Sequence, residues 1–232
     1  MPRSSLRRVL SRVWNAVKPP PAPLPRRRLN RAQRRLIRGT AIAVALGAGT
    51  WAVFAYIASA PDRASSHYRA GMRLLGPGDF EGAAAQFTKA IDILPDYADA
   101  YLGRGKARQS AGQSDAAFAD FEKAIALNPT LELAYALRGT LWRTQGNTPK
   151  ALADFTRSIH LHPTADGYYQ RGLTYQSLDQ LPHAVDDFSL AISYDPGAPQ
   201  LYRARAKARR DSGDIAGARQ DQETAERLER TQ

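Results

Sequence analysis

Apolar residues beyond position 64 recur at intervals of three and four, in short segments separated by Gly or Pro. Ala117, Phe121, Ala124 and Ile125 form one such stripe, which ends at Pro129. Apolar residues at this spacing lie on one face of an α-helix, and a proline cannot continue the helix. The pattern therefore predicts a series of amphipathic helices joined by short turns.

The same residue types return at a fixed interval, which indicates that the helices come in repeating pairs. The recurring positions are 34 and then 33 residues apart: Gly105, Gly139 and Gly172; Ala117, Ala151 and Ala184; Phe121, Phe155 and Phe188; and Pro129, Pro163 and Pro196. A period of this length is typical of stacked two-helix units. The small residues let paired helices approach, and phenylalanine fills the space between them.

The order of residues in each unit resembles the tetratricopeptide repeat, in which an aromatic and a small residue are followed by Ala, Phe, Ala and Pro. The resemblance starts at His67 and Gly71 and covers residues 64 to about 228. It implies an all-α fold, a right-handed α-solenoid of helix-turn-helix repeats. The expected repeats are 64–97, 98–131, 132–164, 165–198 and a degenerate fifth at 199–232. Gln222 replaces the phenylalanine in the fifth, which is expected to cap the stack with a polar face.

Two charged positions vary together among the repeats. An arginine precedes the small residue of the first helix, and an aspartate follows 16 residues later: Arg104 and Asp120, Arg138 and Asp154, Arg171 and Asp187, and Arg205 and Asp221. The first repeat lacks both, having Ala70 and Gln86. Joint presence and joint absence predict structural ion pairs, within one unit or between neighbours. A basic ladder for an acidic ligand is the alternative, but it would not require aspartate at a fixed spacing.

The resemblance also implies a binding surface. Repeats of this family form a concave groove, lined mainly by first helices, that binds peptide segments or partner helices. The positions carried over are Tyr68, Met72, Leu102, Lys106, Gln109, Thr140, Arg143, Thr144, Tyr169, Leu173, Gln176, Arg203, Lys207 and Arg210. The middle of this predicted groove is neutral and its C-terminal end is basic. For many of these residues the alternative is a helix face exposed to solvent.

Charge is distributed unevenly along the chain. The 232 residues carry a formal net charge of +11, and residues 1–38 hold twelve Lys or Arg and no acid, leaving 21 positive and 22 negative charges elsewhere. In this basic arm, residues 5–18 have the pattern of an amphipathic helix suited to an anionic membrane surface, and the Pro-rich stretch 19–25 ends it. The repeats themselves have no excess of positive charge, which argues against a nucleic-acid partner.

A stretch of 23 uncharged residues follows the arm, at 39–61. About 20 apolar residues suffice to cross ~30 Å of hydrocarbon, so the stretch predicts one transmembrane helix; a buried helix of a soluble protein is the alternative. The basic flank precedes the span, and only Arg63 and Arg69 follow it closely. The positive-inside rule therefore predicts a single-pass protein of the inner (cytoplasmic) membrane, with a cytoplasmic N-terminus and periplasmic repeats.

Two other origins of this segment stay open. Residues 58–60 resemble the small-residue end of a cleavable signal peptide, which would release a soluble periplasmic adaptor after Ala60. Pro61 just after that site disfavours cleavage. A mitochondrial targeting sequence has the same Arg-rich, acid-free, amphipathic character.

Residues for catalysis are scarce. The chain has no Cys, and it lacks a phosphate-binding glycine loop, a nucleophile elbow and a zinc-protease motif. His160, His162 and His183 are interpreted as surface or turn residues rather than metal ligands, and His67 as a packed residue. The sequence therefore predicts no enzyme, no metal and no cofactor. It favours a membrane-anchored scaffold that binds partner proteins; a regulator whose basic arm binds anionic lipid or nucleic acid is the alternative.

Overall fold

The computed structural model describes residues 50, 51, 53 and 55–230. The chain divides into two compact units, Met1–Ile57 and Ala58–Gln232. In the first unit, the few described residues are helical. Within the described part of the second unit there are ten helices and no strand: α3 (Ala60–Leu75), α4 (Phe80–Ile93), α5 (Ala98–Ser110), α6 (Ser114–Leu127), α7 (Glu132–Thr144), α8 (Thr148–Leu161), α9 (Ala165–Ser177), α10 (Leu181–Tyr194), α11 (Pro199–Asp211) and α12 (Ile215–Arg230).

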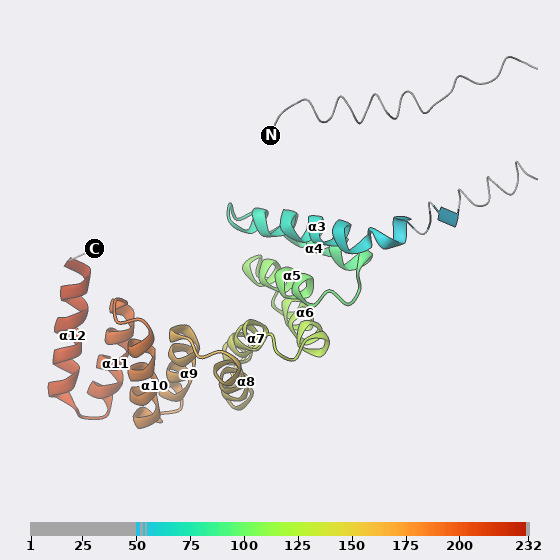
Figure 1. Ribbon diagram of the computed structural model, residues 1–232. Coiled ribbons are helices and arrows are strands. Elements are labelled where there is room, and N and C mark those ends of the chain that lie inside the picture. Colours follow the sequence, from blue (N-terminus) through green and yellow to red (C-terminus); the bar gives the residue numbers. More distant parts are fainter. Residues whose placement is uncertain (1–49, 52, 54, 231–232) are drawn as a thin grey trace, which may run out of the picture. The chain divides into compact units, whose positions relative to one another are not determined.

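The helices pack as five successive pairs, and each pair stacks on the next in chain order (Figure 1). Here the first helices are α3, α5, α7, α9 and α11, and the second helices are α4, α6, α8, α10 and α12. First helices of neighbouring pairs also contact each other, as α7 does α9 and α9 does α11. The predicted all-α solenoid of helix pairs is confirmed.

The turn inside each pair requires a left-handed backbone residue. Glycine supplies it in four turns, with φ between 77° and 90° at Gly78, Gly112, Gly146 and Gly213. Asp179 takes this position between α9 and α10, with a φ of 58°. Glycine adopts positive φ without steric cost, whereas an aspartate tolerates it at some expense.

A fully buried phenylalanine holds each of the first four pairs together. Phe87, Phe121, Phe155 and Phe188 are all 0 % exposed, and each ring lies against the small glycine of the facing first helix. A Cβ atom added to Gly105 would lie 2.5 Å from the ring of Phe121, so only glycine permits this close approach. In the fifth pair the phenylalanine is absent and the small residue is alanine. Without a phenylalanine ring facing it, the first helix of this pair has room for a Cβ atom, so glycine is not required there.

The first repeat helix begins earlier than the sequence predicted. α3 starts at Ala60 rather than near Ala64, with Pro61 and Asp62 in its first turn. Proline has a backbone already suited to the first turn, and an acid there interacts favourably with the helix dipole. Ala60 and Pro61, the last residues of the predicted transmembrane segment, thus lie in the first turn of α3.

The other N-terminal predictions fall mostly on residues that the structure does not describe. These are the basic arm 1–38, with its amphipathic and Pro-rich parts, and positions 39–49, 52 and 54 of the predicted span. Among the residues that are described, no helix has both the length and the apolar character needed to cross a membrane.

Candidate functional site: the face of the first helices

Each arginine and aspartate singled out by the 16-residue spacing forms an ion pair across its own helix pair. Nε and Nη2 of Arg138 donate to the two carboxylate oxygens of Asp154, both at 2.8 Å, and Arg171 binds Asp187 in the same way at 2.9 and 2.8 Å. The four aspartates are only 3 % to 6 % exposed. Hydrogen bonding to the aspartate raises the pKa of Arg138 and Arg171, against the opposing effect of burial. An aromatic ring also lies beside each arginine; the Arg138 guanidinium, for example, is 5.7 Å from the ring centroid of Tyr135.

Two of the four aspartates bind a second arginine that the spacing did not reveal. Arg108 Nη1 donates to Asp120 at 2.8 Å, and Arg209 Nη1 donates to Asp221 at 2.9 Å. Each of these arginines lies one turn beyond the first one on the same helix. In α7 and α9 an aromatic residue occupies that position, and within the described residues Asp154 and Asp187 are each paired with one arginine.

Three of the arginines also bond to the preceding helix pair. Their Nη1 groups donate to hydroxyl oxygens at 3.0 to 3.2 Å: Arg104 to Thr88, Arg171 to Thr156, and Arg205 to Ser189. In the first pair, which lacks both charges, His67 Nδ1 and Gln86 Oε1 are 2.9 Å apart instead. The charged residues thus hold helices within a pair and neighbouring pairs together, as in the structural interpretation of the spacing.

Four residues of the predicted groove are packed into the interior of the stack. The ring centroid of Tyr68 lies 5.6 Å from that of Phe87, and the centroid of Tyr169 lies 5.9 Å from that of Phe188. Leu102 and Leu173 pack against the same kind of buried cluster. These side chains form the floor of the face rather than its outermost layer.

Most polar residues of the predicted groove have partners within the protein. The hydroxyls of Thr140 and Thr144 donate to carbonyl groups of their own helix at 3.0 and 2.9 Å. Gln176 Nε2 donates to Asp211 Oδ2 at 3.5 Å. Met72 is 42 % exposed, and Arg210 is exposed. Lys106 and Gln109 are half-buried.

The basic C-terminal end of the predicted groove is offset by acidic neighbours. Lys207 Nζ donates to Asp211 at 2.8 Å, and Arg203 pairs with Glu229 of α12. The pKa of Asp211 is lowered, chiefly by its hydrogen bond to Lys207. Two of the three cations in this region are therefore neutralised locally.

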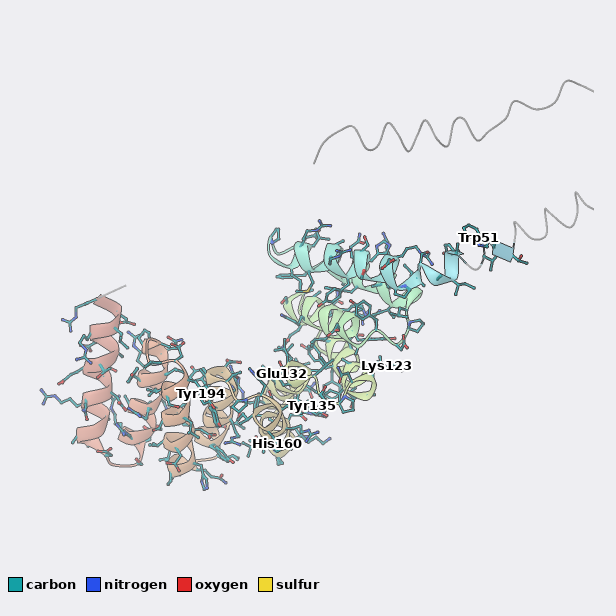
Figure 2. The ribbon with its side chains drawn as sticks, in the orientation of Figure 1. Trp51, Lys123, Glu132, Tyr135, His160 and Tyr194 are labelled. Carbon is teal, nitrogen blue, oxygen red and sulfur yellow. The ribbon has the colours of Figure 1, made fainter. Side chains whose placement is uncertain are left out.

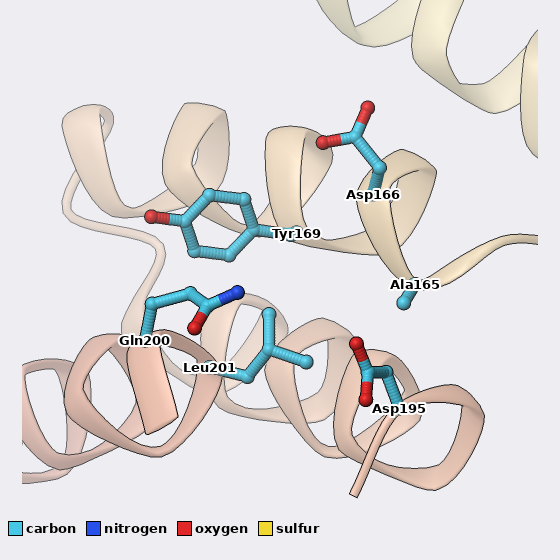
Figure 3. A pocket seen from close by; sticks show the side chains of 6 residues that line it. All are labelled: Ala165, Asp166, Tyr169, Asp195, Gln200 and Leu201. Atoms are coloured by element: carbon cyan, nitrogen blue, oxygen red, sulfur yellow. The ribbon is translucent and has the colours of Figure 1, made fainter. Parts of the chain in front are cut away.

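A cavity of about 260 Å³ opens between α9 and α11. Its lining residues are Ala165, Asp166 and Tyr169 of α9, Gln200 and Leu201 of α11, and Asp195 of the turn before α11 (Figure 3). We call this space the α9–α11 cavity. Its six lining residues combine an apolar floor with an amide, a phenol and two carboxylates, and none of them is a cation.

A chain of hydrogen bonds links this cavity to α7, the first helix of the preceding pair. Arg143 Nη2 on α7 donates to Gln170 Oε1 at 3.1 Å, and Gln170 Nε2 donates to Asp166 Oδ1 at 3.2 Å. Arg143 Nε is buried without a hydrogen-bond partner among the described residues. The Asp166 side chain is therefore held in place by α9 and α7 together.

The histidines considered as metal ligands do not assemble into a site within the described structure. No group of three or more His, Cys, Asp or Glu residues there is placed to hold a metal ion. His183 lies against Tyr175, with ring centroids 5.2 Å apart.

Comparison with known families identifies the helix pairs. Models of the tetratricopeptide repeat match residues 77–112, 102–166 and 165–197, and so follow one another through most of the stack. The chain is a tetratricopeptide repeat protein. The sequence matches no curated protein.

Solved structures similar to this tetratricopeptide repeat protein share its fold. A crystal structure of MamA is 25 % identical, with a TM-score of 0.64 over 73 % of this chain and 93 % of that one. PilF of Pseudomonas aeruginosa is 18 % identical, with a TM-score of 0.68 over 73 % and 78 %. YrrB, described as a tetratricopeptide repeat protein with an unusual peptide-binding site, is 20 % identical, with a TM-score of 0.59 over 70 % and 84 %.

Sequence reasoning about the repeats found only one residue of the α9–α11 cavity, Tyr169. It missed Asp166, Gln200 and Asp195, which line the same space. A signal was available, because Asp166 lies three residues before Tyr169 and so one turn away on the same helix face. Gln200 occupies the corresponding place on α11. Asp195 lies in a turn, where helical spacing gives no information.

Proposed function

We propose that this tetratricopeptide repeat protein is a membrane-anchored scaffold that binds segments of partner proteins on the face of its first helices. The observation that carries the proposal is the α9–α11 cavity. It opens between two first helices and combines an apolar floor with two carboxylates, an amide and a phenol. Stacked helix pairs present an extended surface of this kind for peptide recognition. The MamA and YrrB structures are similar to this fold, and YrrB is described as having a peptide-binding site.

The anchor and its orientation rest on the sequence. The 23 uncharged residues at 39–61, behind twelve basic residues, support a membrane-spanning segment with the repeats on the exported side. Since α3 starts at Ala60, a membrane exit there leaves almost no linker before the first repeat.

Cross-linking in intact cells tests partner binding. A photoreactive residue placed at Thr144, exposed on the first helix α7, is expected to capture partner proteins. The matched control is the same residue at Lys123, exposed on the second helix α6 (Figure 2). Capture at Lys123 but not at Thr144 would contradict binding on the first-helix face.

Topology needs its own measurement. A reporter that is active only outside the cytoplasm, fused after Gln232, is expected to be active, and the intact mass is expected to include the residues from Met1. An inactive reporter would contradict export of the repeats. A mature chain beginning at Pro61 would identify the soluble periplasmic adaptor instead.

A regulator is the second candidate, favoured by the density of positive charge in residues 1–38. Such an arm would bind anionic lipid or nucleic acid on the cytoplasmic side. Deleting residues 1–25 separates the two candidates. A scaffold keeps both its function and the complexes captured at Thr144, because both depend on the repeats alone. A regulator loses the regulatory effect that needs its basic arm, even though those complexes persist.

A further inference from the structure

We infer that the α9–α11 cavity is a subsite for a basic side chain, Lys or Arg, of a bound partner protein. This inference rests on the proposed function and adds the chemistry of the partner segment. It follows from three properties of the cavity: its size, the state of its two carboxylates, and the different residues that occupy the corresponding positions at the other junctions between first helices.

The size fits one side chain. A volume of about 260 Å³ would hold roughly nine water molecules at ~30 Å³ each. It is far larger than a single ion and smaller than most pockets for drug-sized ligands, which start at ~300 Å³. The apolar surface of Tyr169, Ala165 and Leu201 suits the aliphatic stem of a Lys or Arg side chain, whose charged head then reaches polar groups.

The charge of the cavity calls for a cation. Asp166 and Asp195 are both exposed, and among the described residues neither is within ion-pair distance of an arginine or lysine. Asp166 accepts a hydrogen bond only from the neutral Gln170. In Figure 3, Asp195 lies beside Leu201 at the turn before α11, whereas the Asp166 side chain leaves α9 on the side away from α11. A guanidinium or ammonium group is the ligand that complements a carboxylate at this opening.

The same arrangement does not recur in the other repeats. At the α7–α9 junction, Leu133 and His162 occupy the positions of Asp166 and Asp195, and Ala136 replaces Tyr169. At the α5–α7 junction an acid is present at the first position, as Asp99, but Asn128 occupies the second. At the α3–α5 junction these two positions hold Ser65 and Leu94. Two acids and an aromatic residue thus coincide only at the α9–α11 junction, so the repeat motif alone does not require them.

Binding of defined peptide pools tests the inference. The probe is a set of biotinylated decapeptides in which the central residue is fixed as Lys, Arg, Gln or Glu and the others are an equal mixture of Ala, Ser, Leu and Val. The full chain is held in neutral detergent. We expect the Lys and Arg pools to be retained about fivefold better than the Gln pool, because the cavity is partly open to water and screening limits the gain. Raising the salt concentration is expected to reduce this preference.

Variants connect the preference to the cavity. Asp195→Asn and Asp166→Asn are expected to abolish the preference for Lys and Arg while leaving retention of the Gln pool unchanged. Asp186→Asn removes the same charge from an exposed position of α10 and is the matched control. Circular dichroism of each variant checks that the helices are intact.

The possible failures are distinct. If no pool is retained above bare resin, the proposed function fails and the inference fails with it. If pools are retained equally whatever the central residue, or if Asp195→Asn and Asp186→Asn behave alike, only the basic subsite is wrong. Retention of the Glu pool above the Lys pool would also overturn it.

Discussion

Removing one arginine from the ladder of buried ion pairs should have an effect that depends on whether a second arginine remains. Asp187 is 3 % exposed, and Arg171 is its ion-pair partner among the described residues. Asp120, equally buried, binds both Arg104 and Arg108. Arg171→Met therefore leaves a buried carboxylate without a cation, whereas Arg104→Met leaves one that is still paired.

The magnitudes follow from the burial of the charges. Breaking a buried pair by removing one partner costs about 3–5 kcal/mol, because the remaining charge stays in the interior. The Arg171 side chain is 18 % exposed, so water can partly replace it, and we expect a loss of about 3 kcal/mol for Arg171→Met. For Arg104→Met we expect about 1 kcal/mol, the contribution of an ordinary set of hydrogen bonds.

Equilibrium unfolding in urea, followed by circular dichroism, measures both losses from the shift of the midpoint at constant slope. Arg219→Met is the control, since that side chain is 82 % exposed and should contribute less than about 1 kcal/mol. The double variant Arg104→Met with Arg108→Met should lose about as much stability as Arg171→Met. This loss should exceed the sum of the losses in the two single variants, because only the double variant leaves Asp120 without a cation. Equal losses for Arg171→Met and Arg104→Met would refute the reasoning.

Three further variants test other parts of the structure by the same unfolding measurement. Gly105→Ala should destabilise by about 1 kcal/mol in spite of alanine's helix preference, because its Cβ would lie 2.5 Å from the ring of Phe121; a gain in stability would contradict this close packing. Asp179→Gly should stabilise by up to about 1 kcal/mol, since it relieves the positive φ of 58°, and an unchanged midpoint would show that the turn is unstrained. Burial, followed by the charge of Asp99, raises the pKa of Tyr68 above 10.0, so the folded state favours the neutral phenol. That contribution is present below about pH 10 and lost as pH rises through the folded value, so Tyr68→Phe should reduce the loss of stability as the pH rises above about 10; an unchanged loss would contradict it.

Most of the fold could be predicted from the repeat period, because each repeat contacts only its neighbours. The glycine and phenylalanine spacings are enough to predict helix pairs, since one small residue and one large ring must meet in each. The start of α3 was harder to predict. Ala60 and Pro61 fit an uncharged membrane segment and a helix N-terminus equally well, so the sequence alone does not decide where α3 starts.

The binding face was harder to predict than the core for a physical reason. Core positions are fixed by the helix period, whereas a cavity depends on which side chains from separate helices and turns happen to leave space. Tyr169 illustrates the difference, because its position in the repeat suggests a contact residue while its ring also packs on Phe188. Substituting it would disturb the core and the cavity together. Charge pairing separates the two roles better, since the aspartates that hold the fold have arginine partners and those at the α9–α11 cavity have none among the described residues. Exposed acids without an ion-pair partner are common in the described part of this chain, so the sign of a binding site is two such acids lining one cavity together with an aromatic ring.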